Sequence, residues 1–84
     1  MKSLELKLFH RTQRELATAI NQVVDAYWRN EMAEKHLIEN IKALYNNNSE
    51  KLLKEDKFTT IIQQQCGKRR LSVVKNILEL PVEL

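Results

Sequence analysis

The sequence predicts one small domain that is all-α or nearly so, with three or four helices arranged around a helical hairpin. Its 84 residues are too few for two ordinary domains, so we expect residues 1–84 to fold as one unit. Only one glycine and one proline interrupt the chain, which favours long helices. Apolar residues make up 43% and charged residues 30%, the balance of a folded domain and not of a disordered segment.

The N-terminal residues have two interpretations. Three leucines alternate with charged residues from Leu4 to Leu8, which is the period of two expected of a short, half-buried strand. The alternative is a helix that Ser3 caps and that runs into the next segment, because leucine and lysine favour helices. The sequence leaves strand and helix open for these residues.

The clearest helix begins at about Gln13. Residues 12–15 have the form of a capping box, in which the Thr12 hydroxyl and the Glu15 carboxylate satisfy amide donors at a helix start. An apolar stripe then follows at helical spacing. Its members are Leu16, Ile20, Val23, Val24 and Tyr27, and it continues to Trp28.

Tyr27 and Trp28 cannot both point inward, because neighbouring residues differ by about 100° around a helix axis. We expect both rings to cover the core and the hairpin turn, with one partly exposed. An exposed ring would instead mark a dimer interface or a base-stacking surface.

A second helix should follow the polar turn at residues 29–31 and pack antiparallel to the first. Its apolar stripe is Leu37, Ile38, Ile41, Leu44 and Tyr45. Three asparagines should end it, because asparagine tolerates left-handed backbone. They are Asn46, Asn47 and Asn48. The two stripes would form the core of a helical hairpin.

The last third of the chain predicts a link and two further helical segments. Residues 49–57 are highly charged and suit a short helical turn or an irregular link. Thr59 or Thr60 can cap a segment that Gly67 would end. A final helix, closed by Pro81, has a stripe of its own. That stripe consists of Leu71, Val74, Ile77 and Leu78.

The residues do not predict an enzyme, a metal site or a cofactor. With two histidines, one cysteine and one glycine, the chain has no zinc-ligand spacing and no phosphate-binding loop. His36 and Glu39 share a helix face, but such a pair on a surface helix is ordinarily solvated. Cys66 is best explained as a small residue beside a helix end. A lone cysteine and no long apolar segment predict a cytoplasmic protein without a membrane partner.

One segment predicts an anionic partner. Residues 57–78 contain five basic residues and no acidic one, within a chain of net charge +3. If Gly67 ends a helix, then Lys68, Arg69 and Arg70 occupy the first turn of the next, where the helix dipole disfavours cations. A bound phosphate would make that placement favourable.

We therefore expect nucleic-acid binding through these three cations. The assisting residues would be Gln63, Gln64, Gln65, Lys57 and Lys75. Arg11 and Arg14 would extend the patch if the fold brought the two helix starts together. The alternatives are a helix that runs through Gly67 with a solvated basic face, or a basic surface for an acidic protein.

Two known DNA-binding motifs match only in part. In a helix-turn-helix with Gly67 in the turn, Gln63 replaces the usual small residue and Lys68 the usual apolar one. In a ribbon-helix-helix, Glu5 would face the phosphates. The competing class is a homodimeric or adaptor module whose apolar helix faces complete their core against another chain.

Residues 11–28 (RTQRELATAINQVVDAYW) and 58–71 (FTTIIQQQCGKRRL) resemble a family of short uncharacterised proteins from Gram-positive bacteria. The resemblance extends from about Phe9 to Leu78. It implies a bacterial, cytoplasmic setting. It implies no activity, cofactor or partner, and it assigns no functional residue.

Overall fold

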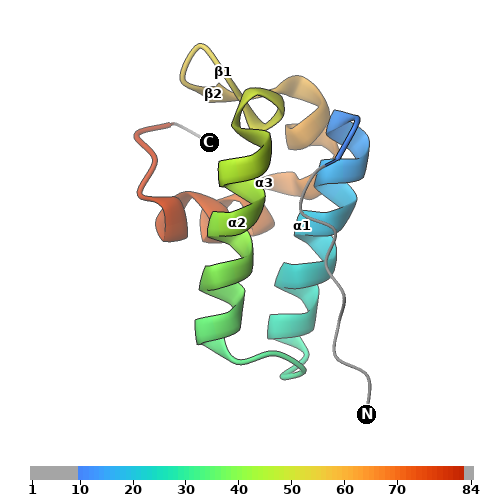
Figure 1. Cartoon of the computed structure of the whole chain (residues 1–84), viewed down its shortest axis with the longest axis vertical. Coiled ribbons are helices and arrows are strands. Elements are labelled where there is room, and N and C mark those ends of the chain that lie inside the picture. Colours follow the sequence, from blue (N-terminus) through green and yellow to red (C-terminus); the bar gives the residue numbers. More distant parts are fainter. Residues whose placement is uncertain (1–9, 83–84) are drawn as a thin grey trace.

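A computed structural model describes residues 10–82 and shows three helices with a very short β-hairpin between the second and the third (Figure 1). The predicted fold class is confirmed. The strand expected at residues 4–8 lies outside the described residues. In chain order the elements are α1 (Gln13–Trp28), α2 (Glu34–Leu52), β1 (Leu53–Lys54), β2 (Lys57–Phe58) and α3 (Thr60–Leu78).

Helix α1 begins at the predicted capping box. The amide of Glu15 donates to the Thr12 hydroxyl at 3.0 Å. The Glu15 carboxylate accepts from the amide of Arg11 at 3.1 Å, one residue before the expected cap amide. Both bonds satisfy donors that have no partner within the helix, which explains why the helix starts at Gln13.

Helices α1 and α2 lie side by side and run in opposite directions, as expected of a helical hairpin (Figure 1). The chain reverses after Trp28 with a left-handed backbone at Asn30 (φ 62°). The predicted stripes pack against each other in the core, except for Ile38, which is only partly buried and lies outside it. Helix α1 also contributes three buried alanines that leave room for its neighbours. These are Ala17, Ala19 and Ala26.

The prediction that the second helix ends at the three asparagines is confirmed in part, because helical geometry is interrupted at Asn48 but a further helical turn follows. Only Asn48 leaves helical geometry (φ −142°, ψ 27°), and the helix continues to Leu52. The buried Asn48 amide is hydrogen-bonded on both sides at this break, since its Oδ1 accepts from the amide of His10 and its Nδ2 donates to the carbonyl of Leu44, both at 2.9 Å. The extra turn carries Leu52 into the core.

The charged link is also more regular than expected. After the last turn of α2, Leu53 pairs with Phe58 and Lys54 with Lys57 in an antiparallel hairpin. Glu55 (φ 53°) and Asp56 (φ 64°) form its turn with left-handed backbone at both positions. Buried Phe58 anchors the hairpin to the core.

Helix α3 is broken at Gly67, as the sequence predicts. Thr59 caps its start, with the amide of Ile62 donating to the Thr59 hydroxyl at 3.4 Å. Gly67 has φ 81° and ψ 165°, a backbone conformation essentially confined to glycine, so residues 60–66 and 68–78 form two helical segments. The alternative of an uninterrupted helix is wrong. The second segment ends at Leu78, with Glu79 in left-handed backbone.

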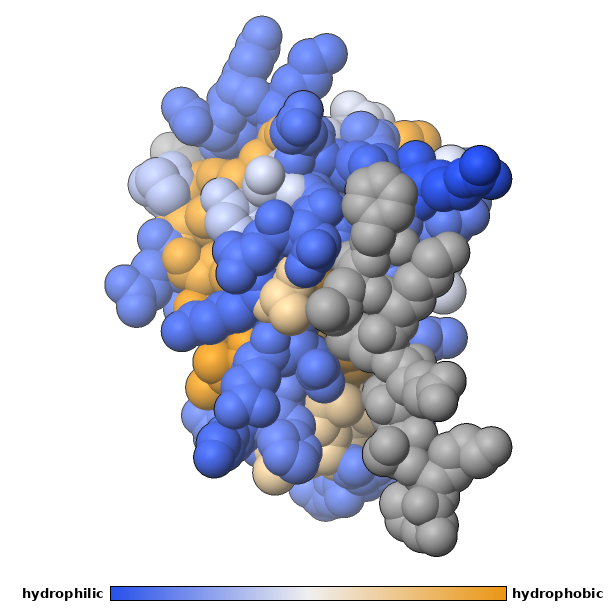
Figure 2. Space-filling view, viewed as in Figure 1, coloured by the Kyte–Doolittle hydropathy of each residue, from blue (hydrophilic) through white to orange (hydrophobic). Residues whose placement is uncertain are grey.

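Helix α3 crosses behind the hairpin and closes the core (Figure 1). It contributes four buried residues, which are Ile62, Cys66, Leu71 and Val74. Tyr27 is half-buried against this core, whereas Trp28 is 43% exposed, so one of the two rings is partly exposed as expected. Figure 2 shows a mostly hydrophilic face over α2, with apolar surface on its left side, where the later part of α3 lies behind it.

Within residues 10–82, no helix combines the length and the apolar character required to cross a lipid bilayer.

Candidate nucleic-acid interface

The break in α3 lies against the middle of α1. The last carbonyls of the segment 60–66 lack helical partners, and α1 supplies one. Asn21 Nδ2 donates to the carbonyl of Gln65 at 3.0 Å. The thiol of Cys66 lies 3.8 Å from the carbonyl of Ala17 and donates to it. One side chain and one backbone carbonyl of α1 thus hold the end of the first segment in place.

Arg70 fastens the start of the second segment to the same helix. Its Nε and Nη2 donate to the two oxygens of Asp25, both at 2.9 Å, and its Nη1 donates to the carbonyl of Cys66 at 3.1 Å. The hydrogen bonds from Arg70 lower the pKa of the Asp25 carboxyl below its usual value. Arg70 is therefore a structural residue whose charge Asp25 balances.

Arg69 contacts the exposed ring at the end of α1. Its guanidinium carbon lies 5.5 Å from the centroid of the Trp28 ring, within the range of a cation–π interaction. Both side chains are exposed. This pair is a further contact between α1 and the basic turn, by which we mean Lys68, Arg69 and Arg70.

These contacts form one row, which we call the α1–α3 seam: Asn21, Asp25 and Trp28 on α1 against Gln65, Arg70 and Arg69 on α3. The three α1 residues are spaced by four and three, so they share one face of the helix. Asn21 and Asp25 were not predicted as partners of the residues around Gly67. Their spacing of four residues, with Trp28 three residues further on, is the sequence signal that places them on one face of the helix.

The predicted cations consequently have different environments. Lys68 is exposed and makes no hydrogen bond or ion pair with any residue in the described range. Lys75 is half-buried and lies two turns further along the same helical segment, about 10 Å away at 1.5 Å per residue. Lys68, Arg69 and Lys75 thus remain as cations whose charge no described carboxylate pairs with.

The predicted glutamines do not all gather at the break. Gln64 is exposed, and Gln65 is half-buried beside Asn21. Gln63 Nε2 donates to the carbonyl of Phe58 at 2.7 Å, so Gln63 belongs to the start of α3 together with Lys57. Gln63 and Lys57 are therefore separated from the basic turn.

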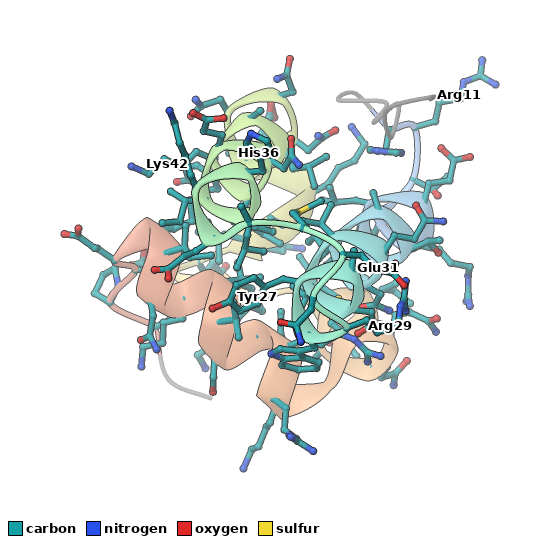
Figure 3. All side chains as sticks on the ribbon, turned by 90° about the horizontal axis from the view of Figure 1, so that it is seen from below. Arg11, Tyr27, Arg29, Glu31, His36 and Lys42 are labelled. Carbon is teal, nitrogen blue, oxygen red and sulfur yellow. The ribbon has the colours of Figure 1, made fainter. Side chains whose placement is uncertain are left out.

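Arg11 and Arg14 do not extend the basic turn. They lie at the beginning of α1, whereas Asp25 and Trp28 near its end contact Arg70 and Arg69. Eleven residues separate Arg14 from Asp25, about 16 Å along the helix. Figure 3 shows Arg11 at the upper right of the view, well away from Arg29, which follows Trp28 and lies lower on the same side.

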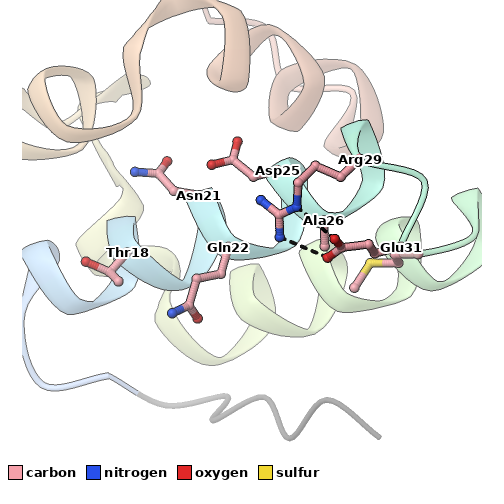
Figure 4. Close-up of a pocket in the computed structure, with 8 residues that line it drawn as sticks. Thr18, Asn21, Gln22, Asp25, Ala26, Arg29 and Glu31 are labelled. Carbon is pink, nitrogen blue, oxygen red and sulfur yellow. Dashed lines mark hydrogen bonds and ion pairs between the residues drawn. The ribbon is translucent and has the colours of Figure 1, made fainter.

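An open hollow of about 460 Å³ lies beside the seam along α1 (Figure 4). At one end Arg29 donates two hydrogen bonds of 3.0 Å to Glu31, and these lower the pKa of the Glu31 carboxyl. Asp25, which also lines the hollow, is bound to Arg70. Both carboxylates are thus neutralised by arginines, which does not resemble a metal or acid–base site.

Two further features bear on chemistry: the environment of Cys66 and the distribution of side chains that could bind a metal ion. Burial raises the pKa of the Cys66 thiol to about 11, so the thiol is protonated at neutral pH and a poor nucleophile. In the part of the chain that the structure describes, no group of three or more histidine, cysteine or acidic side chains lies close enough to hold a metal ion.

No curated protein and no solved structure matches the chain significantly. A family model does match, over residues 7–79. This match covers most of the chain and agrees with the extent of the resemblance seen in the sequence. The chain therefore belongs to a family described as conserved hypothetical protein.

Proposed function

We propose that the protein binds nucleic acid without catalysis, through phosphate contacts at Lys68 and Arg69. The observation that carries this proposal is the arrangement after the break of α3, where exposed Arg69 lies over the exposed Trp28 ring and exposed Lys68 directly precedes Arg69 in the chain. Phosphates recruit lysine and arginine side chains, and an aromatic ring beside them is typical of surfaces that bind nucleic-acid strands. We place this binding in the cytoplasm of a bacterium, since the lone cysteine fits a reducing compartment.

The local charge balance supports an anionic partner. The two nearby carboxylates, Asp25 and Glu31, are each paired with an arginine, and residues 57–78 contain no acidic side chain. The positive charge of Lys68 and Arg69 is therefore not cancelled by their neighbours. Lys75 adds a third cation on the same segment.

Such a small patch predicts weak, salt-sensitive binding. Three phosphate contacts lower affinity by roughly 20- to 40-fold between about 50 and 200 mM salt, because counterions released on binding must be taken up again. The experiment is fluorescence anisotropy of labelled random-sequence DNA and RNA at these two salt concentrations. We expect binding at the lower concentration and its collapse at the higher.

A matched pair of variants tests the location. The double variant Lys68→Gln with Arg69→Gln should abolish binding. The control, Lys35→Gln with Lys42→Gln, removes the same charge from the exposed side of α2 and should retain most of the binding affinity. Arg70 is left intact, because its loss would disrupt the α1–α3 seam. Equal loss in both variants would mean that net charge, and not this site, governs binding.

A second candidate function is a homodimeric or adaptor module. It is favoured by the apolar surface beside α2 in Figure 2 and by four partly buried apolar residues near the end of the chain. These are Val73, Ile77, Leu78 and Leu80. Sedimentation equilibrium distinguishes the two functions, because an apolar dimer would persist at high salt.

A further inference from the structure

Trp28 differs from the other large apolar side chains of residues 10–82, because it alone is strongly exposed. A single exposed apolar side chain is ordinary on a protein surface. What distinguishes this ring is its neighbour, because the Arg69 guanidinium lies 5.5 Å from the ring centroid. Lys68, which precedes Arg69 in the chain, is also exposed. An indole thus lies against one cation, and a second exposed cation adjoins the first in the chain.

We propose that Trp28 is a stacking platform for an unpaired base, so that the preferred partner is single-stranded nucleic acid. On binding, a base takes the place of Arg69 over the ring, and the Arg69 guanidinium moves to a phosphate of the same strand. This inference rests on the proposed function and specifies which class of nucleic acid is bound.

The exchange follows from the relative strengths of the contacts. Stacking of a base on an aromatic side chain is stronger than a cation–π contact at an exposed site. The displaced guanidinium gains a charge-assisted hydrogen bond to a phosphate oxygen, which it lacks over the ring. Every base has a flat π face, so the platform tolerates any sequence.

The surrounding contacts hold the platform in place before the strand arrives. The two hydrogen bonds between Arg70 and Asp25 fix the turn that carries Lys68 and Arg69 against the helix that carries Trp28. Arg29, the residue after Trp28, is bound to Glu31, so that carboxylate does not present an uncompensated negative charge. A pre-formed site loses less conformational entropy on binding.

The geometry of nucleic acids then determines the preference. In a duplex, the faces of the bases are stacked on one another inside the helix, so a ring on the surface of a folded domain does not reach them. A single strand presents unpaired bases between its phosphates. A duplex would bind through phosphate contacts alone.

The experiment compares three probes of about 12 nucleotides, a length within the range of single-stranded sites. They are an ordinary single strand, an abasic single strand with the same phosphates, and a hairpin duplex. DNA and RNA versions of the ordinary strand show whether the sugar matters. The chain contains one tryptophan, so its fluorescence reports on Trp28 directly.

We expect the ordinary strand to bind roughly tenfold more tightly than the abasic strand or the duplex, and it alone should quench the fluorescence of Trp28. Trp28→Leu should reduce affinity for the ordinary strand to that for the abasic strand, measured with labelled probes. Trp28→Tyr, which keeps an aromatic face, should retain most of the preference. Circular dichroism of both variants verifies the fold.

Equal affinity for ordinary and abasic strands, without quenching, would overturn the stacking platform. If Lys68→Gln with Arg69→Gln still abolished that binding, phosphate recognition would stand without it. Binding of none of the probes at about 50 mM salt would overturn the proposed function as well.

Discussion

Two helices of this protein contain one non-helical residue each, and the two breaks are built in different ways. In α2, Asn48 leaves helical geometry while its own side chain is hydrogen-bonded on both sides. In α3, Gly67 has no side chain, so residues from α1 and from the next turn stabilise the break. The first break joins His10 to α2, whereas the second brings cations to the surface.

The difference has a functional consequence. The Asn48 side chain is buried, and its hydrogen bonds are made inside the protein to His10 and Leu44. The Gly67 break turns the chain so that Arg70 reaches Asp25 while Lys68 and Arg69 stay exposed. Substitutions at each break should therefore affect stability in both cases but the proposed binding only at the second.

The largest effect is expected at Asn48. Asn48→Leu leaves the amide of His10 and the carbonyl of Leu44 buried without these partners, which should lower the free energy of unfolding by about 2–4 kcal/mol. The control is Asn47→Leu, because Asn47 Nδ2 donates to Ala43 at 2.8 Å from an exposed position. Urea unfolding measures both. Similar losses in the two variants would contradict the assignment of the effect to burial.

Gly67 should be next in magnitude. Gly67→Ala forces an L-residue to φ 81°, ψ 165°, and should cost about 1–3 kcal/mol through the backbone alone, since an added Cβ has no atom within 4 Å. D-Alanine, introduced by chemical synthesis, favours this backbone region and is the control. We expect urea unfolding to show lost stability for L-alanine and unchanged or higher stability for D-alanine. Equal losses would show that the break does not depend on backbone conformation.

These two residues also show how far the sequence was informative. The Gly67 break was predictable because glycine alone adopts this conformation freely, and apolar stripes follow on both sides. The three asparagines carried the same kind of signal, but whether a helix ends or only deviates depends on a distant partner, His10, which local spacing does not reveal. The helices and the capping threonines depend on neighbours within four residues and were predicted.

The candidate site was predicted only in part for the same reason. The run Lys68 to Arg70 is visible in the sequence, but the separate roles of its members depend on Asp25 and Trp28, more than 40 residues earlier. The β-hairpin was missed because Glu55 and Asp56 are not the residues that usually mark such a turn.

A smaller effect is expected from the ion pair that closes the second break. Asp25→Asn should lower the free energy of unfolding by about 1 kcal/mol at neutral pH, because the pair is bidentate but partly exposed. The pKa of Asp25 is lowered in the folded protein, so its contribution is complete above the unfolded value of about 3.9 and disappears as the pH falls through the folded value. The native protein should therefore lose more stability than the variant over that acidic range.

Glu31→Gln is the control for this pH dependence, because it removes a fully exposed ion pair with Arg29. Thermal unfolding at several pH values should show that Glu31→Gln loses much less stability at neutral pH than Asp25→Asn does. If Asp25→Asn left the acid dependence of the native protein unchanged, the ion pair would not be what stabilises the break.

The smallest effect is expected at Asn21, whose amide can be compared directly with that of Asn48. Asn48 uses its oxygen and its nitrogen, whereas the Asn21 amide donates to Gln65 but its buried Oδ1 accepts from no described residue. Asn21→Ala removes one hydrogen bond and also removes an unsatisfied oxygen, and the two effects oppose each other. We expect a loss of only about 0.5 kcal/mol in urea unfolding. A loss as large as that of Asn48→Leu would mean that Oδ1 has a donor, such as a bound water, and that both breaks depend on fully satisfied amides.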